Sequence, residues 1–255
     1  MAEAKFEFTG VRGNRLSGRL HEPGPASGSW AIFAHCFTCG KDSVAAARIS
    51  RALAAESIGV LRFDFAGIGS SEGRLADSSF AADVDDLISA AGAIADAGKK
   101  PALLIGHSLG GAAALAAAGS IPSIRAVATI GAPFDVKHVL RQFDPGSLEK
   151  IKREGEAEVL LAGRPFVVRR SFIEDLERHD LTTSIVHLDR ALLVMHSPRD
   201  STVDIQNAAQ IFGAAKHPKS FMSLDGADHL LSKSDDAGYA AKVISAWASH
   251  YVRNG

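Results

Sequence analysis

The sequence predicts an α/β protein built on one mostly parallel sheet with helices on both faces. Short apolar runs of strand length alternate along the chain with longer stretches of helical spacing, and each run ends close to a Gly, Pro, Asp or His. This alternation is typical of a parallel sheet whose crossover helices cover both sides. Because right-handed crossovers bring the loops after the strands to one edge, we expect the chemistry along that edge.

The individual elements follow from their local patterns. The stretch from Lys5 to His21 alternates around three glycines and predicts a leading antiparallel pair. The strands expected after it are short and apolar, and they cover residues 30–34, 60–65, 102–106, 126–130, 191–195 and 220–224. The helices expected between them cover residues 44–57, 80–97, 111–119, 205–215 and 239–252.

One connection is unusually long. Residues 136–190 separate two consecutive predicted strands, whereas connections of this kind usually have roughly 2 to 6 residues. We therefore expect a small lid insertion at 136–190 in a core formed by residues 1–135 and 191–255. Within it, Glu158–Val168 predicts a hairpin around Ala162-Gly163-Arg164, and Ser171-x-x-Glu174 predicts a capping box that opens a helix.

Composition narrows the function classes. The 255 residues are 46% hydrophobic, which allows a sizeable core, and the formal net charge of −1 argues against nucleic acid as a partner. The N-terminus lacks a basic head followed by an apolar stretch, and no run of about 18 apolar residues occurs. With only two cysteines, a reducing compartment is the default. We expect a soluble cytoplasmic protein without a membrane partner.

Two serines fit the pattern G-x-S-x-G, and their context separates them. Gly106-His107-Ser108-Leu109-Gly110 directly follows an apolar strand and directly precedes an Ala-rich helix. That strand, turn and helix arrangement holds a serine in an exposed, strained position, as a nucleophile requires. Gly69-Ser70-Ser71-Glu72-Gly73 lies in a loop with no helix directly after it, so Ser71 is interpreted as part of a turn.

A serine hydroxyl needs a base, and the base needs an orienting carboxylate. Of ten histidines, His229 follows the last predicted strand in a Gly-containing loop, on the same edge as Ser108, whereas His107 adjoins the serine but points away along the turn. Asp200 follows the preceding strand in a tight turn and is the preferred acid. Asp204 stays open as an alternative, although its place before a helix suits a cap.

Acyl transfer also develops an oxyanion, which two backbone N–H groups usually stabilise. One donor is expected to be Leu109, which follows the serine at the start of a helix. The second should come from the loop after the first parallel strand, His35-Cys36-Phe37-Thr38-Cys39-Gly40, with Phe37 preferred.

Together these residues resemble the α/β-hydrolase family over essentially the whole chain. The resemblance rests on the His35-Cys36-Phe37 loop, on Asp64 to Ser71 after the next strand, on the serine motif, and on Asp200 and His229. It implies an α/β-hydrolase fold and a serine esterase core with Ser108, Asp200 and His229 as triad and Phe37 and Leu109 as oxyanion hole.

Two groups within the family are the most similar. Bacterial serine hydrolases that are sometimes fused to an OsmC-type peroxidase domain carry stretches similar to His217 to Leu231. Because this chain ends at Gly255, we expect no OsmC domain. Cinnamoyl and feruloyl esterases have a comparable insertion and an HGFT loop, but here the loop reads HCFT, so Cys36 stands in place of the glycine.

The cysteines leave two interpretations open. Cys36-Phe37-Thr38-Cys39 is a CxxC, yet no second pair completes a zinc site, so neither a metal nor another cofactor is expected. The favoured interpretation is that both are small packing residues. The alternative is that the thiols form a disulfide that distorts the oxyanion hole and acts as a redox switch.

The function that the sequence predicts is cleavage of small-molecule carboxylic esters through an acyl-enzyme intermediate, with short to medium or aromatic acyl groups. Apolar residues of the insertion are expected to line the acyl pocket, and they are Leu140, Phe143, Phe166 and Phe172. Acyl transfer, peptide cleavage and non-catalytic binding of a small molecule are the alternatives. The oligomeric state is left open.

Overall fold

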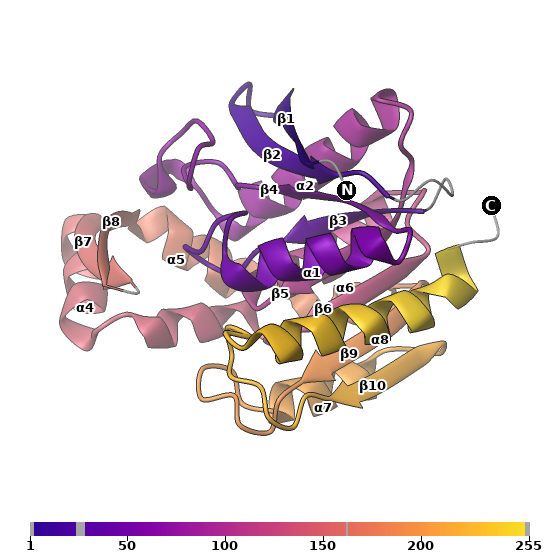
Figure 1. The fold of residues 1–255 in the computed structure, drawn as a ribbon. Helices are drawn as coiled ribbons and strands as arrows, with labels where there is room; N and C mark the ends of the chain where they lie inside the picture. Colours follow the sequence, from indigo (N-terminus) through magenta and orange to yellow (C-terminus); the bar gives the residue numbers. More distant parts are fainter. Residues whose placement is uncertain (1–2, 24–28, 162, 253–255) are drawn as a thin grey trace.

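The computed structural model describes residues 3–23, 29–161 and 163–252, and its centre is an eight-stranded sheet (Figure 1). The strand order is β1-β2-β4-β3-β5-β6-β9-β10. β1 (Glu3–Thr9) and β2 (Arg15–His21) form the predicted antiparallel pair, and β2 is also antiparallel to β4. All other neighbours are parallel, which confirms the predicted fold class.

The parallel strands lie close to their predicted positions. They are β3 (Trp30–Ala34), β4 (Gly59–Phe63), β5 (Pro101–His107), β6 (Ala126–Ile130), β9 (Ala191–His196) and β10 (Lys219–Ser223). The largest difference is at β4, which was expected to continue to Phe65. It ends earlier because the next residue, Asp64, turns its carboxylate to the backbone N–H groups of Lys41 and Ser70.

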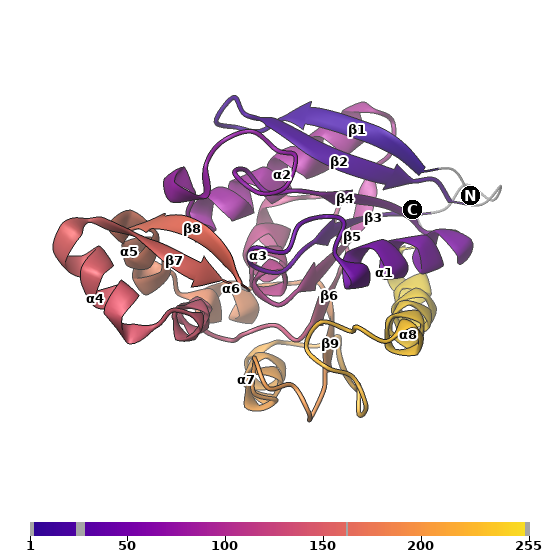
Figure 2. The same ribbon diagram turned by 60° about the vertical axis from the view of Figure 1, so that its left-hand side comes forward.

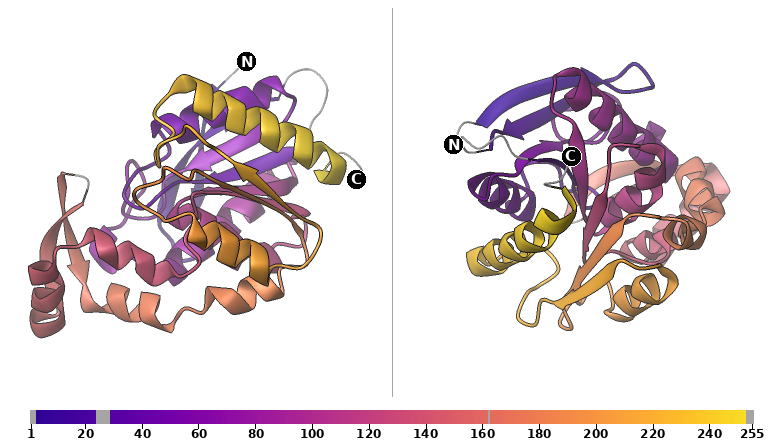
Figure 3. Two further views of the ribbon diagram at one scale, coloured as in Figure 1. Left: turned by 90° about the horizontal axis from the view of Figure 1, so that it is seen from below. Right: turned by 90° about the vertical axis from the view of Figure 1, so that its right-hand side faces the viewer.

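Helices cover both faces of this sheet, as predicted. α1 (Val44–Ala55) packs beside α8 (Ser234–Val252) on one face. The other face carries α2 (Phe80–Asp96), α3 (Leu109–Ala117), α6 (Leu181–Val186) and α7 (Gln206–Ala214) (Figure 3). Short 3₁₀ turns are η1 (Leu75–Asp77), η2 (Ala118–Ser120) and η3 (Val136–Gln142). Among the described helices, none is long and apolar enough to cross a membrane.

The two faces of the sheet support two separate apolar cores. Along β3, Ile32 points to the core beneath α2 and α3, whereas Phe33 points to the core beneath α1 and α8. The alternation follows from the two-residue period of a strand. Because Ile32 and Phe33 are almost fully buried, each adds roughly 1.5–3 kcal/mol to the stability of the fold. This burial on both sides makes the sheet a rigid base for the loops at its edge.

Residues 136–190 form their own group of elements between β6 and β9. After η3 come α4 (Pro145–Glu154), β7 (Glu156–Leu161), β8 (Arg164–Arg169), α5 (Arg170–Arg178) and α6. β7 and β8 form the predicted antiparallel hairpin, although Ala162 in its turn lies outside the described residues. In Figure 2 the hairpin and α4 project to one side of the sheet.

The predicted capping box is wrong. α5 begins at Arg170, so Ser171 lies inside the first turn and Arg169 occupies the N-cap position without a side-chain cap. β8 runs directly into the helix, and the N–H of Arg170 donates instead to the carbonyl of Gly155 at 2.8 Å. A tertiary backbone contact therefore replaces the local cap.

Candidate active site

Ser108 occupies a strained turn between β5 and α3. Its backbone has φ 56° and ψ −125°, a left-handed conformation that usually costs a non-glycine residue on the order of 1–3 kcal/mol. The N–H of Ser108 donates to the carbonyl of Ile130 at the end of β6, which anchors the turn to the sheet.

Two glycines make this turn possible. A Cβ atom at Gly106 would lie 2.3 Å from the carbonyl oxygen of Gly110, and one at Gly110 would lie 2.4 Å from the carbonyl oxygen of Ala34. Both distances are far below van der Waals contact, so only glycine fits at either position. The spacing of the serine motif is therefore a requirement of backbone packing.

The three residues expected to form a triad lie in one hydrogen-bonded chain. His229 Nε2 is 3.1 Å from Ser108 Oγ, and His229 Nδ1 is 2.7 Å from Asp200 Oδ2. Because the carboxylate accepts from the protonated Nδ1, Nε2 carries a lone pair toward the hydroxyl. The three side chains come from the ends of β5, β9 and β10, as expected for loops that share one edge of a parallel sheet.

Asp200 is held ionised inside the protein. Its carboxylate also accepts from the backbone N–H groups of Thr202 and Val203, at 2.9 and 2.8 Å. Burial alone would raise the pKa of Asp200, but the hydrogen bonds from His229 and the backbone outweigh it and hold the pKa below its usual value. A buried carboxylate that stays charged can stabilise an imidazolium beside it.

The structure gives Ser71 and Asp204, the alternatives to Ser108 and Asp200, other hydrogen-bond partners. Ser71 donates its hydroxyl to the carbonyl of Asp64 and accepts from the N–H of Ser17, so it serves the turn predicted for it. Asp204 is exposed and accepts from the N–H of Gln206, the first residue of α7, so it supports the start of that helix although Ile205 occupies the N-cap position.

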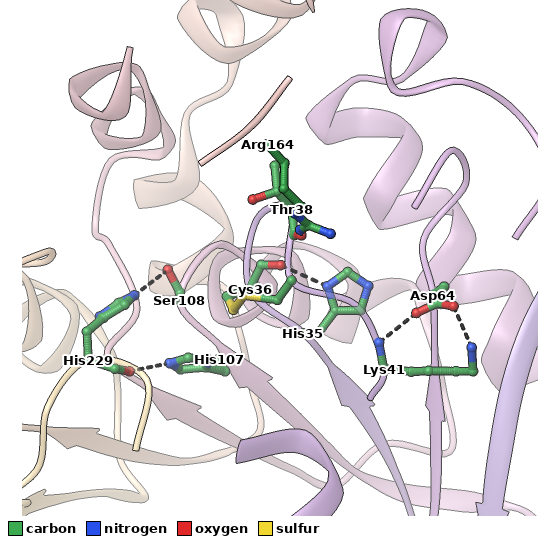
Figure 4. Close-up of a disulfide and its surroundings, with 10 residues drawn as sticks. His35, Cys36, Thr38, Lys41, Asp64, His107, Ser108, Arg164 and His229 are labelled. Carbon is green, nitrogen blue, oxygen red and sulfur yellow. Dashed lines mark hydrogen bonds and ion pairs between the residues drawn. A yellow bond between two sulfur atoms is a disulfide. The ribbon is translucent and has the colours of Figure 1, made fainter. Parts of the chain in front are cut away.

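His107 contributes to the site in a way that sequence reasoning missed. Its Nε2 donates to the backbone carbonyl of His229 at 2.6 Å, and the two rings lie 5.1 Å apart (Figure 4). Burial lowers the pKa of His107 to about 4, and the neighbouring His229 adds to the effect, so the ring is neutral at neutral pH. The prediction that His107 is not the base agrees with this geometry, because its ring does not reach the serine hydroxyl. Nothing in the sequence indicated, however, that His107 holds the loop that carries His229.

The two residues expected to supply the oxyanion donors line the same small cavity, and their role as donors stays a prediction. Leu109 is the first residue of α3 and Phe37 lies in the turn after β3, and within the described chain neither backbone N–H has a hydrogen-bond acceptor. His35, buried beneath the turn, accepts from the N–H of Phe65 through Nε2 and donates from Nδ1 to the carbonyl of Cys36 at 2.8 Å. Burial lowers the pKa of His35, which keeps it in the neutral form that this pattern requires.

Cys36 and Cys39 form a disulfide, so their interpretation as two free packing residues is wrong. The bridge closes the turn that contains Phe37, with Cα atoms 5.4 Å apart. Thr38, inside the bridge, has a positive φ of 61°. Its carbonyl accepts a hydrogen bond from the guanidinium of Arg164 on the β7–β8 hairpin (Figure 4).

The residue that follows the turn is fixed as well. The ammonium group of Lys41 forms a buried ion pair with Asp64 at 2.6 Å, and the backbone N–H of Lys41 donates to the same carboxylate. A charge pair this well hydrogen-bonded anchors the end of the turn to the loop after β4.

The four residues expected to line an acyl pocket divide into two groups. Phe143 and Phe172 are buried, and their rings stack on Phe37 with centroids 6.4 and 5.5 Å apart. Leu140 and Phe166 are half-buried beside the same apolar core. The structure thus places insertion residues against Phe37 in the turn after β3, and their binding of substrate stays a prediction.

A small cavity of about 10 Å³ lies beside Phe37 and Leu109. Its lining combines apolar and polar side chains, and the residues are His35, Cys36, Phe37, Thr38, Phe65, Ile68, Leu75, Asp83, Leu109, Gly110 and Ala113. Across the described part of the chain, no three His, Cys, Asp or Glu side chains form a group that could hold a metal ion.

Comparison with known proteins agrees with this geometry. Residues 31–242 match the Alpha/beta hydrolase family, and the chain belongs to it. A solved esterase domain of a Rhodothermus marinus protein is 47% identical, covers 98% of this chain and 99% of that chain, and superposes with a TM-score of 0.81.

More distant relatives broaden the picture. Mouse "Palmitoyl-protein thioesterase ABHD10, mitochondrial" is 31% identical over 157 residues, which are 59% of this chain and 52% of that protein. The chain thus spans about half the length of this thioesterase. Est1E from Butyrivibrio proteoclasticus, solved with ferulic acid, shares the fold at 17% identity, with a TM-score of 0.80 over 96% of this chain and 98% of that one.

Proposed function

We propose that this protein is a serine hydrolase that cleaves small-molecule carboxylic esters through an acyl-enzyme intermediate. The observation that carries the proposal is the continuous hydrogen-bonded chain from Ser108 through His229 to the buried Asp200. The similarity to an esterase domain at 47% identity supports the same reaction class.

The proposed reaction has two halves. His229 Nε2 takes the proton of Ser108 as Oγ attacks the ester carbonyl, and the imidazolium then protonates the leaving alcohol. Asp200 holds the imidazole in the required tautomer and stabilises its positive charge. In the second half, water attacks the acyl-enzyme with His229 again as base and releases the acid.

The negative charge that develops on the carbonyl oxygen is assigned to the N–H groups of Phe37 and Leu109. Both donors are free of other acceptors within the described residues, so each is available to the oxyanion. Loss of one such donor typically costs about 3–4 kcal/mol of transition-state stabilisation.

The acyl group is proposed to enter the small cavity beside these donors. That cavity has a volume of only about 10 Å³, room for about one water molecule, so its lining by Phe65, Ile68 and Ala113 must shift to admit a short to medium or aromatic acyl chain. Residues 136–190 are assigned as a lid, because Phe143 and Phe172 pack on Phe37 and Arg164 bonds to Thr38. The similarity to palmitoyl-protein thioesterases makes thioesters a second leaving-group class to test.

The test compares wild type and Ser108→Ala on p-nitrophenyl esters from acetate to decanoate and on the matching acyl thioesters, with fluorophosphonate labelling of both proteins. Loss of both turnover and labelling in the variant, on the order of 10⁶-fold in kcat, is the expected result. Labelling of the wild type without turnover of any ester would favour acyl transfer or peptide cleavage. No labelling would favour a non-catalytic binding protein.

A further inference from the structure

The Cys36–Cys39 disulfide closes the turn that presents one of the two oxyanion donors. We propose that this disulfide is a redox-modifiable site, with a low-molecular-weight thiol as its reactant, and that only the oxidised form holds Phe37 in the position required for fast turnover. The inference rests on the proposed esterase function, since it concerns the same oxyanion hole. It also reverses the sequence-based hypothesis, in which the disulfide would distort that site.

The first argument is the space that two reduced sulfurs need. Bonded sulfurs lie about 2 Å apart, whereas non-bonded heavy atoms in contact lie about 3.5–4 Å apart. Cys36 is 4% exposed and its carbonyl is held by His35, so its backbone is restrained on that side. Cys39 is half-buried, and the separation must therefore open on its side of the turn. Phe37 and Thr38 lie between the two cysteines and move with that opening.

The second argument is the strain inside the bridge. Thr38 is β-branched and has a φ of 61°, a conformation that persists only where its surroundings enforce it. The covalent bridge, the 3.1 Å hydrogen bond from the N–H of Cys39 to the carbonyl of Cys36, and the Arg164 contact all enforce it here. Removal of the covalent restraint lets Thr38 relax toward negative φ, which turns the backbone that carries the Phe37 N–H.

The effect on catalysis depends on how closely the oxyanion donors must approach the oxyanion. Its donors must lie about 2.7–3.1 Å from the developing oxyanion, so a displacement of about 1 Å or more removes most of the benefit. Leu109, at the start of α3, is unaffected by the bridge and continues to donate. We therefore expect kcat to fall on the order of 10²-fold upon reduction, with KM nearly unchanged.

The chemical step is thiol–disulfide exchange. A thiolate attacks Sγ of the partly exposed Cys39 and forms a mixed disulfide, while Cys36 leaves as a thiolate and takes a proton from water. A second thiolate attacks the outer sulfur of the mixed disulfide, which releases Cys39 and the oxidised small-molecule disulfide. Two electrons pass to the protein, and exchange with an oxidised small thiol reverses the reaction.

The experiment compares oxidised and reduced wild type in the same ester assay. The protein is reduced with dithiothreitol and passed through a desalting column under nitrogen, because free thiols themselves cleave activated esters. Thiol titration of the denatured protein reports the state directly, since Cys36 and Cys39 are the only cysteines in the chain. Circular dichroism and Tm verify that the reduced protein is folded, and fluorophosphonate labelling reports on Ser108 separately.

The matched variant is Cys36→Ser/Cys39→Ser, which cannot form the bridge. We expect its kcat to equal that of reduced wild type and to ignore reductant, and we expect reoxidation of wild type with oxidised glutathione to restore kcat.

Equal kcat in the two verified redox states, or a higher kcat after reduction, would overturn the proposal, as would unfolding of the reduced protein. Absence of both turnover and labelling in either state would instead reject the proposed function.

Discussion

The turns that carry Ser108 and Phe37 are held in place by different kinds of contact. Ser108 sits on a turn set by backbone packing, in which Gly106 and Gly110 leave no room for a side chain and Ile130 anchors the serine N–H. Phe37 sits on a turn held by side chains, namely the local disulfide, the adjacent His35 and, from the distant hairpin, the guanidinium of Arg164. The first turn depends on close backbone packing, whereas the second depends on side chains that can be reduced or moved. The proposed lid and the proposed redox reaction would therefore act on the Phe37 turn and leave the Ser108 turn in place.

The largest effect that tests this comparison is expected on the nucleophile side. Asp200→Asn would present an amide to His229 Nδ1, which favours the wrong tautomer and removes the base at Nε2. We expect kcat to fall on the order of 10⁴-fold with little change in Tm. Asp204→Asn, at the exposed start of α7, is the matched control and should retain activity. A loss below tenfold for Asp200→Asn would exclude it as the acid of the triad.

A pH effect on stability should show that His107 is buried in its neutral form. Its pKa is about 4 in the folded protein against 6.5 for the free side chain, so the unfolded chain binds the proton first as the pH falls. Neutral His107 contributes fully to the free energy of unfolding above pH 6.5. This contribution declines as the pH falls from 6.5 to 4, and it changes no further below pH 4. Between pH 7 and 4.5 the wild type should lose about 2 kcal/mol of unfolding free energy from this group. Urea unfolding at the two pH values should show that His107→Gln loses about 2 kcal/mol less unfolding free energy than the wild type. Equal losses in the two proteins would contradict the lowered pKa of His107.

The hydrogen bond from His107 should also affect turnover. His107→Met leaves the carbonyl of His229 without its buried donor, which commonly costs about 1–3 kcal/mol, and we expect kcat to fall about tenfold or more. His107→Gln keeps a donor at a similar reach and should recover most of this loss. Equal kcat values for the two variants would show that the hydrogen bond does not position the base.

The smallest effect is expected from the hairpin contact. Arg164→Met removes one of several restraints on the oxyanion turn, and the kcat of the oxidised protein should fall about threefold, as for the loss of one ordinary hydrogen bond. Arg169→Met is the matched control, because Arg169 bonds to Glu156 and Asp77 and does not touch the turn. If the bridge and Arg164 restrain the same turn, Arg164→Met should lower kcat by a larger factor in the reduced protein than in the oxidised protein.

Sequence reasoning was most successful where local sterics decide the outcome. The strands at Trp30–Ala34 and Ala126–Ile130 end where predicted, because uninterrupted apolar runs bounded by turn residues fit only a strand buried on both faces. The approach of Ser108, Asp200 and His229 was also predictable, since parallel strands present their following loops on one edge. The bounds of the helix after Ser108 were less accurate, because Leu109 and Gly110 enter the helix as part of the serine turn.

The sequence by itself therefore determined the parallel sheet, the serine turn and the chain order of the hydrogen-bonded triad, because each depends on residue spacing and on the backbone conformations that glycine allows. Only the tertiary structure decided that Cys36 and Cys39 are bonded, that His107 bonds to the His229 carbonyl, and that Arg164 reaches Thr38 across 126 positions of sequence. The contacts of His107 and Arg164 depend on the relative placement of elements far apart in the chain, which has no local signature. Cys36 and Cys39 are only three positions apart, and the conformation of the turn between them decides whether they meet. The oxyanion half of the site belongs to this second group, and for that reason it is the half in which we place regulation.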